Sequence, residues 1–159
     1  MLDGLYLEFD QIVAQRGAYK VETIGDAFLV CCGAPTPRSP RESSVVIAKC
    51  ALDMLEVVRG FRAPGGLKLQ ARIGVHCGAV MAGVIGTEMP RYQLFGRSVD
   101  KAGDMESGGE PGRVKASAEL ISFLREAGDD ARDISVRDLT DDGCGFLDRN
   151  RAFKLIQAW

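Results

Sequence analysis

Residues 20–30 read Lys-Val-Glu-Thr-Ile-Gly-Asp-Ala-Phe-Leu-Val, and this stretch decides the fold. Residues typical of strands lie on both sides of Gly25 and Asp26, and glycine adopts the positive φ that a tight hairpin turn requires. The pattern therefore predicts two short strands within residues 19–32, joined at residues 24–27. We expect Asp26 at or beside the tip of this hairpin.

Helices are expected on both sides of the hairpin. Apolar residues recur every three or four positions over residues 2–16, and Gly17 supplies a stop signal. Residues 33–40 contain three prolines and indicate a loop. A second amphipathic helix is expected over residues 43–58, ended by Gly60.

The remaining sequence mixes strands and helices. Residues 67–77 alternate apolar and polar side chains over eleven positions, which predicts one long strand. Further along the chain we expect strands at 92–95, 113–116, 134–139 and 153–157, and helices at 98–107 and after the capping residue Ser117. This order predicts a single α+β domain over residues 1–159, with a mixed, mainly antiparallel sheet covered by helices in a ferredoxin-like arrangement.

The composition excludes several classes of function. A formal net charge of −2 gives no basic footprint for binding a nucleic acid polymer. The longest apolar runs, such as residues 27–32 and 80–85, are too short to span a bilayer, and the first ten residues lack the basic region of a signal peptide. We expect a cytoplasmic domain without direct membrane insertion, either alone or as the cytosolic part of a larger membrane or sensor protein.

Cysteine and histidine give no sign of a metal centre. The five cysteines form no CxxC pair, which indicates neither a zinc site nor a disulfide framework, and we expect reduced, mostly buried thiols. His76 is the only histidine. Its position on the polar side of a predicted strand favours a structural role over a catalytic one.

Two stretches closely resemble class III nucleotide cyclases, the adenylyl and guanylyl cyclase family, and are most similar to the guanylyl kind. Residues 20–30 resemble the family's hairpin motif, and the similarity extends over about residues 2–124. Because several motifs match in order and at the family's spacing, the resemblance is more specific than one short motif. The later matches are Arg72 to Gly78, Ala82 to Gly86, Met89 to Gly96 and Met105 to Ser107.

The resemblance implies a βαββαβ core and a head-to-tail dimer, formed with a second copy or with another cyclase domain. Nucleotide sites lie at the dimer interface, where the ribose 3′-hydroxyl of a nucleoside triphosphate attacks its own α-phosphate. Two Mg²⁺ or Mn²⁺ ions, held by two aspartates, support this reaction because such hard ions prefer oxygen ligands. Asp26 matches the second aspartate, although an aspartate is also favoured in any turn. The first aspartate belongs to a strand that precedes the family's opening helix, and this sequence begins at that helix. We therefore expect the strand and half of the metal site to be missing.

Two positions bear on the choice of base. Glu22 matches the glutamate of guanylyl cyclases, whose carboxylate accepts from guanine, whereas adenylyl cyclases typically carry lysine there. The alternative for Glu22 is an exposed strand charge. Gln93 stands where the guanylyl kind has cysteine and the adenylyl kind aspartate, and an amide can serve either purine. The resemblance therefore favours GTP over ATP.

Two departures from the family bear on catalysis. In the family, a helix carries an asparagine that orients the ribose and, four residues later, an arginine that neutralises the reacting phosphate. Asp100 and Asp104 occupy these positions here. A charge pair at about 4 Å is worth roughly 4 kcal/mol at an effective dielectric of 20, so the loss of that attraction costs about a thousandfold in rate. Lys101 and Arg97 lie nearby, but neither occupies the position of the arginine itself, and we do not expect them to replace it.

The family's phosphate-binding lysine near the C-terminus also has no clear counterpart. The comparable residues 141–146 are acidic, and Lys154 lies in a strand-like run. Two hypotheses follow. The chain is a guanylate cyclase domain that makes a cyclic nucleotide weakly or not at all as a homodimer, or it is a pseudocyclase module that dimerises with an active cyclase chain and regulates it.

Overall fold

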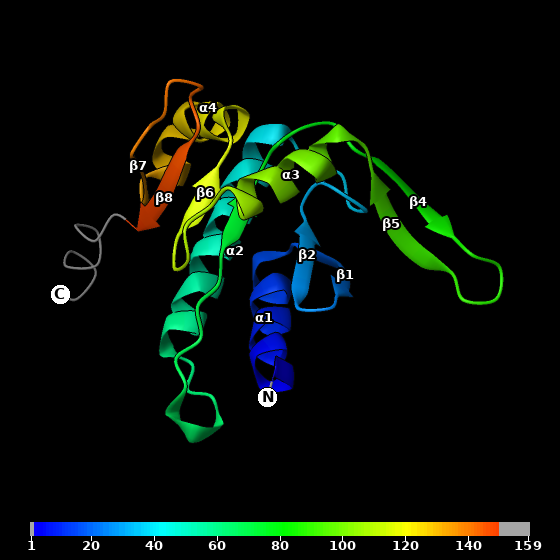
Figure 1. Ribbon diagram of the computed structural model, residues 1–159. Helices are drawn as coiled ribbons and strands as arrows, with labels where there is room; N and C mark the ends of the chain where they lie inside the picture. The colour runs from blue at the N-terminus through cyan, green and yellow to red at the C-terminus, as the bar shows by residue number, and fades with distance from the viewer. Residues whose placement is uncertain (1, 150–159) are drawn as a thin grey trace.

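The computed structural model describes residues 2–149, which form three separate sheets; helices pack against two of them, and the third projects as a two-stranded ribbon (Figure 1). Among these residues, no helix combines the length and the apolar composition needed to cross a membrane. The helices are α1 (Leu2–Arg16), α2 (Pro40–Gly60), α3 (Arg97–Ser107) and α4 (Ala118–Ala127), with short 3₁₀ turns η1 (Pro64–Gly66) and η2 (Gly128–Ala131). The strands are β1 (Tyr19–Ile24), β2 (Ala27–Cys31), β3 (Ile73–Val75), β4 (Met81–Ile85), β5 (Arg91–Phe95), β6 (Val114–Ala116), β7 (Ile134–Arg137) and β8 (Gly145–Arg149).

Helices α1 and α2 form a layer that carries the hairpin of β1 and β2. Leu5 and Phe9 of α1 are buried against Met54 and Val58 of α2. The ring of Phe28 on β2 packs beside this cluster. Each apolar side chain of this size contributes about 1.5–3 kcal/mol when it is fully buried. The helix predicted before the hairpin and the hairpin itself are both confirmed.

The four-stranded sheet carries a second core. Its order is β3-β6-β8-β7, with β3 and β6 parallel and the other two pairs antiparallel. Val114 of β6 and Leu120 and Ile121 of α4 are almost completely buried there, beside residues of α2. Helix α2 therefore takes part in both cores and holds the hairpin and the sheet together. The predicted α+β class, with mixed pairing and helices packed on the strands, is confirmed.

Helix α3 lies directly on β3. A Cβ atom on Gly74 would stand 2.1 Å from the backbone nitrogen of Glu106 and 2.5 Å from the carbonyl oxygen of Ala102. Real Cβ atoms essentially never approach so closely, so this packing requires glycine. The contact fixes the position of α3 and of Asp100 and Asp104 on it.

The long strand predicted over residues 67–77 is wrong in extent. Only Ile73–Val75 forms a strand, paired with the three residues of β6. Residues 67–72 form no strand; Lys68 makes an isolated bridge with Arg62, and the carbonyl of Ala71 accepts a hydrogen bond from Gly112. Alternating side chains report which face is buried, whereas a ladder also needs a neighbouring strand of equal length.

Several boundaries also differ from the prediction. Helix α2 begins at Pro40 rather than residue 43, because Ser39 and Glu42 form a capping box and proline suits the first helical position. β7 ends before Asp138, whose φ is +50°. β8 was not anticipated. The strand expected at 153–157 lies outside the described residues.

Candidate functional site

The hairpin places Asp26 at its tip, as predicted. β1 and β2 pair up to Ile24 and Ala27, which leaves Gly25 and Asp26 as the turn, and Gly25 has a φ of +61°. Asp26 is exposed, and within residues 2–149 no hydrogen bond or ion pair engages its carboxylate. An exposed, unpaired carboxylate suits a hard cation. No group of three potential ligands that could hold a metal ion lies within that same range, so Asp26 cannot form a complete cage there.

Glu22 and Gln93 lie on two different ribbons that meet. Glu22 is half-buried on β1 beside an irregularity in the ladder, and Gln93 is half-buried on β5, paired with Gly83 of β4. The rings of Tyr19 on β1 and Tyr92 on β5 contact each other edge to face, with centroids 5.2 Å apart. The fold therefore brings the two strands that carry Glu22 and Gln93 together.

Asp100 and Asp104 are exposed on α3, one helical turn apart. Asp100 lies in the first turn, where the helix dipole favours an anion. Asp104 lies near the opposite end, where the dipole disfavours one. Neither carboxylate forms an ion pair with any residue that the structure describes. Both negative charges are therefore presented to solvent without a cation to neutralise them.

The nearest lysine is occupied elsewhere. Lys101 on α3 donates a hydrogen bond to the carboxylate of Glu119 on α4. This hydrogen bond is the main cause of a raised pKa for Lys101. It is also the largest of the effects that together lower the pKa of Glu119 to about 2. Arg97 is exposed at the start of α3. The sequence alone did not reveal the role of Glu119, because its partner is eighteen residues away and belongs to another helix.

His76 holds the end of β3 to the start of α4. Its Nδ1 atom lies 2.8 Å from the hydroxyl oxygen of Ser117, which also accepts a hydrogen bond from the backbone nitrogen of Leu120. The His76 side chain is 6% exposed, and burial lowers its pKa. The imidazole is thus largely covered and bonded to a helix cap, an arrangement that favours the structural role predicted for it.

All five cysteines are free. Cys50 and Cys144 are buried, and the other three are half-buried, so the thiols are more accessible than expected. Burial raises the pKa of Cys31 to about 11 and that of Cys50 to about 12. These two thiols are therefore poor nucleophiles.

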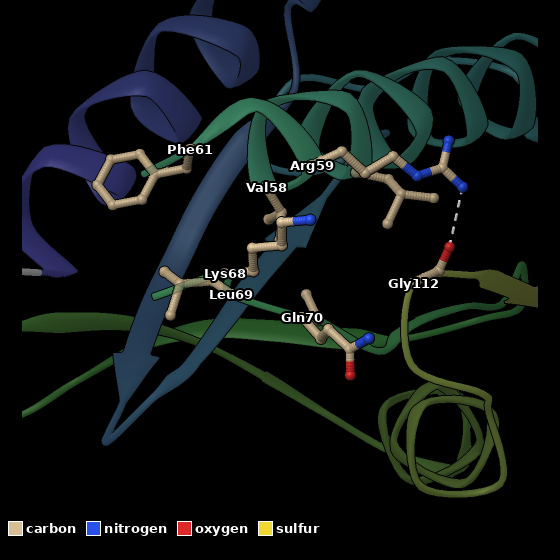
Figure 2. Close-up of a pocket in the computed structure, with 9 residues that line it drawn as sticks. Val58, Arg59, Phe61, Lys68, Leu69, Gln70 and Gly112 are labelled. Carbon is tan, nitrogen blue, oxygen red and sulfur yellow. Dashed lines mark hydrogen bonds between the residues drawn. The ribbon is translucent and has the colours of Figure 1, made fainter. Parts of the chain in front are cut away.

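Two pockets lie outside the candidate residues. One, of about 450 Å³, opens between β2, the start of α2 and the segment after β3, with Cys32, Ser43 and His76 in its wall. The other, of about 260 Å³, lies at the far end of α2, where Arg59 donates to the carbonyl of Gly112 (Figure 2). None of the five candidate side chains lines either pocket.

The C-terminal loop offers no phosphate-binding cation. It is folded by its own acidic side chains, because Asp142 accepts from the Thr140 hydroxyl and from the backbone nitrogen of Cys144. These bonds, the first of them most strongly, lower the pKa of Asp142. Lys154 lies outside the described residues.

Comparisons with known proteins agree with this architecture. A family model described as the adenylate and guanylate cyclase catalytic domain matches residues 1–141. Guanylyl cyclase C of Rattus norvegicus is 47% identical over 127 residues, which cover 79% of this chain and 12% of that protein. A receptor-type guanylate cyclase of Caenorhabditis elegans is 42% identical over 130 residues, which cover 80% of this chain and 12% of that protein. The chain thus spans a small part of these relatives.

Solved structures show the same fold. The monomeric guanylyl cyclase domain of the RhoGC fusion protein from Blastocladiella emersonii has a TM-score of 0.77 at 32% identity, covering 92% of this chain and 77% of that one. The guanylate cyclase domain of RhGC from Catenaria anguillulae, solved in complex with GTP, has a TM-score of 0.75 at 32% identity, covering 92% and 79%. The chain belongs to the adenylate and guanylate cyclase catalytic domain family, as the sequence motifs predict.

Proposed function

We propose that this chain is a cyclase domain of the guanylyl kind in which base recognition is retained and phosphate chemistry is impaired. It binds GTP in preference to ATP and forms the cyclic nucleotide weakly or not at all as a homodimer. The observation that carries this proposal is the charge of α3. Asp100 and Asp104 are exposed without a cation, and Lys101 is held by Glu119.

The base-reading half of the proposed site consists of Glu22 and Gln93. A carboxylate accepts hydrogen bonds from the N1–H and the amino group of guanine, whereas adenine offers no donor at N1. The amide of Gln93 both donates and accepts, so it does not discriminate by itself. Preference for GTP therefore rests mainly on Glu22.

The metal-binding part of the proposed site is Asp26. Its exposed carboxylate at the hairpin tip fits Mg²⁺ or Mn²⁺, which prefer oxygen ligands. One carboxylate is too few to hold such an ion alone, so oxygens of the triphosphate would supply further ligands. When bound, the metal lowers the pKa of the attacking hydroxyl and offsets negative charge on the phosphates.

A dimer is proposed because the candidate residues form no enclosed pocket in one chain, and because the β4–β5 ribbon is apolar and exposed. This ribbon projects away from the rest of the chain (Figure 1). Met81, Val84 and Met89 are each about two thirds or more exposed on it. Apolar groups gathered on a projecting ribbon favour contact with another protein surface, here a second copy or another cyclase domain.

The effect of α3 on the reaction is electrostatic. The transition state gathers negative charge on the reacting phosphate, which a nearby cation stabilises. A carboxylate in the place of that cation removes the attraction and adds a repulsion. The rate of the chemical step falls more than the affinity for the base, because Glu22 and Gln93 act at the other end of the nucleotide.

The second candidate function is a pseudocyclase that partners an active cyclase chain. The retained hairpin and the exposed ribbon favour it, because both allow dimerisation without requiring turnover by this chain. The two functions differ when the protein is mixed with an active guanylyl cyclase domain. A regulatory partner changes the rate of that domain in proportion to the heterodimer formed, whereas a weak enzyme adds only its own rate.

Base selectivity tests the proposed function directly. We expect a fluorescent GTP analogue to bind more tightly than the ATP analogue in the presence of Mn²⁺, and Glu22→Lys to reverse that order. Glu8→Lys, an exposed change of the same charge on α1, is the matched control and leaves the order unchanged. Equal binding of both analogues by the unmodified protein would refute the assignment of Glu22.

A further inference from the structure

The two residues proposed to read the base are held on separate ribbons. β1 pairs only with β2, and β5 pairs only with β4, so no backbone ladder connects the strand of Glu22 to the strand of Gln93 in the described chain. Backbone hydrogen bonds therefore fix the strand of Glu22 within one ribbon and the strand of Gln93 within the other. The spacing between them depends on side-chain packing between β1 and β5.

The hairpin has a firm attachment of its own. The Phe28 ring lies 5.5 Å from the Tyr6 ring and 5.4 Å from the Phe9 ring, measured between centroids. Lys20 forms an ion pair with Asp10 of α1 at 2.9 Å. Glu22 is thus carried on a hairpin that several contacts hold against α1.

The β4–β5 ribbon has much less support. Its side chains are largely exposed along β4, and β5 is held at its end by the start of α3. The edge-to-face contact between Tyr19 and Tyr92 joins it to the hairpin. Gln93 follows Tyr92 directly on β5, so a shift of the β5 backbone that displaces the Tyr92 ring also moves Gln93.

We propose that Tyr19 and Tyr92 are positioning residues that set the distance between Glu22 and Gln93 and thereby the selectivity for the purine base. This inference rests on the proposed function. The two rings act on the site through Glu22 and Gln93. Their contact holds the β4–β5 ribbon against the hairpin, so that both hydrogen-bonding groups meet one base edge.

The pair acts through ring shape rather than through its hydroxyl groups. An edge-to-face contact requires two aromatic rings at the observed spacing, and neither hydroxyl forms a hydrogen bond with a described residue. Phenylalanine is therefore expected to replace either tyrosine without loss. Alanine removes the contact and allows the ribbon to turn about its attachment to α3.

The experiment measures dissociation constants for fluorescent GTP and ATP analogues in the presence of Mn²⁺. For Tyr92→Ala we expect the preference for the GTP analogue to fall at least about threefold, with Tyr19→Ala acting in the same direction. Tyr92→Phe is expected to keep the preference of the unmodified protein. Phe61→Leu, which removes a ring at the far end of α2, serves as the control and lowers thermal stability without changing the preference.

The outcomes separate this inference from the proposed function. If the unmodified protein prefers the GTP analogue and Tyr92→Ala keeps that preference while folded, the positioning role is wrong and the proposed function stands. An equal loss of affinity for both analogues also overturns the positioning role. If the unmodified protein binds neither analogue, the proposed function fails and the inference fails with it.

Discussion

Lys101 on α3 donates a hydrogen bond to the carboxylate of Glu119 on α4, and this contact links two helices whose sequence positions gave no sign of it. The lysine is the cation nearest to Asp100 and Asp104 along the chain. Because it is paired with Glu119, it is not free to neutralise these two carboxylates. The exposed face of α3 is therefore more negative than its composition implies.

Replacement of Glu119 by Gln tests whether the ion pair between Lys101 and Glu119 makes the stability of the protein depend on pH. The pKa of Glu119 is held at about 2 instead of 4.5, chiefly by the hydrogen bond from Lys101. A folded-state pKa below the unfolded value adds stability above pH 4.5, and that stability is lost as the pH falls toward 2. The side chain is 44% exposed, so the contribution is small and weakened by salt.

Urea midpoints of the unmodified protein and of Glu119→Gln, compared across pH, provide the measurement. The unmodified protein is expected to have the higher urea midpoint. This difference in midpoint should be constant above pH 4.5 and should shrink as the pH approaches 2. Glu126→Gln, an exposed change on the same helix, should show no such difference. If the urea midpoints of Glu119→Gln and the unmodified protein differ by the same amount at every pH, the ion pair between Lys101 and Glu119 does not contribute to stability as described.

Restoration of a cation on α3 should strengthen triphosphate binding. For Asp104→Arg we expect the affinity for a GTP analogue with Mn²⁺ to rise at least about tenfold, because a repulsion of a few kcal/mol becomes an attraction. Asp104→Asn removes only the repulsion and should give a smaller gain. Titration by fluorescence anisotropy measures both. Unchanged affinity in the arginine variant would mean that α3 does not face the triphosphate.

Gly74 is expected to be essential for the packing of α3 on β3. For Gly74→Ala we expect the free energy of unfolding to fall by about 1–3 kcal/mol, as other overpacked sites do, because the added Cβ meets the backbone of α3. Gly83→Ala is the matched control, since nothing lies within 4 Å of that Cβ position on β4. Urea unfolding distinguishes them, and similar stability of the two variants would contradict the close approach.

Local signals in the sequence predicted much of this fold. Gly25 and Asp26 specify a hairpin turn within four residues. Ser117 marks the start of α4 because it caps that helix. Both elements were therefore placed correctly. The start of α2 was missed because its capping residue, Ser39, and its first residue, Pro40, lie in a proline-rich stretch that we expected to be a loop. β8 was missed because Gly145 to Arg149 shows no clear alternation.

The features of the fold that the sequence did not predict depend on pairing between residues far apart in the chain. Residues 67–77 carry a clear strand pattern, yet the length of β3 is set by the short strand β6 beside it, forty residues further along the chain. The same limit applies to the candidate site. Glu22, Asp26 and Gln93 are candidates on the basis of sequence motifs, whereas the contacts of Tyr19 with Tyr92 and of Lys101 with Glu119 depend on tertiary structure.

Turnover by the purified protein tests the central claim most directly. The protein is incubated with GTP and Mn²⁺, and cGMP is measured beside an Asp26→Ala control. We predict product at or near the level of that control, with GTP still bound by the unmodified protein. Steady formation of cGMP that disappears in Asp26→Ala would contradict the account, because it would show that Asp100 and Asp104 do not prevent the reaction.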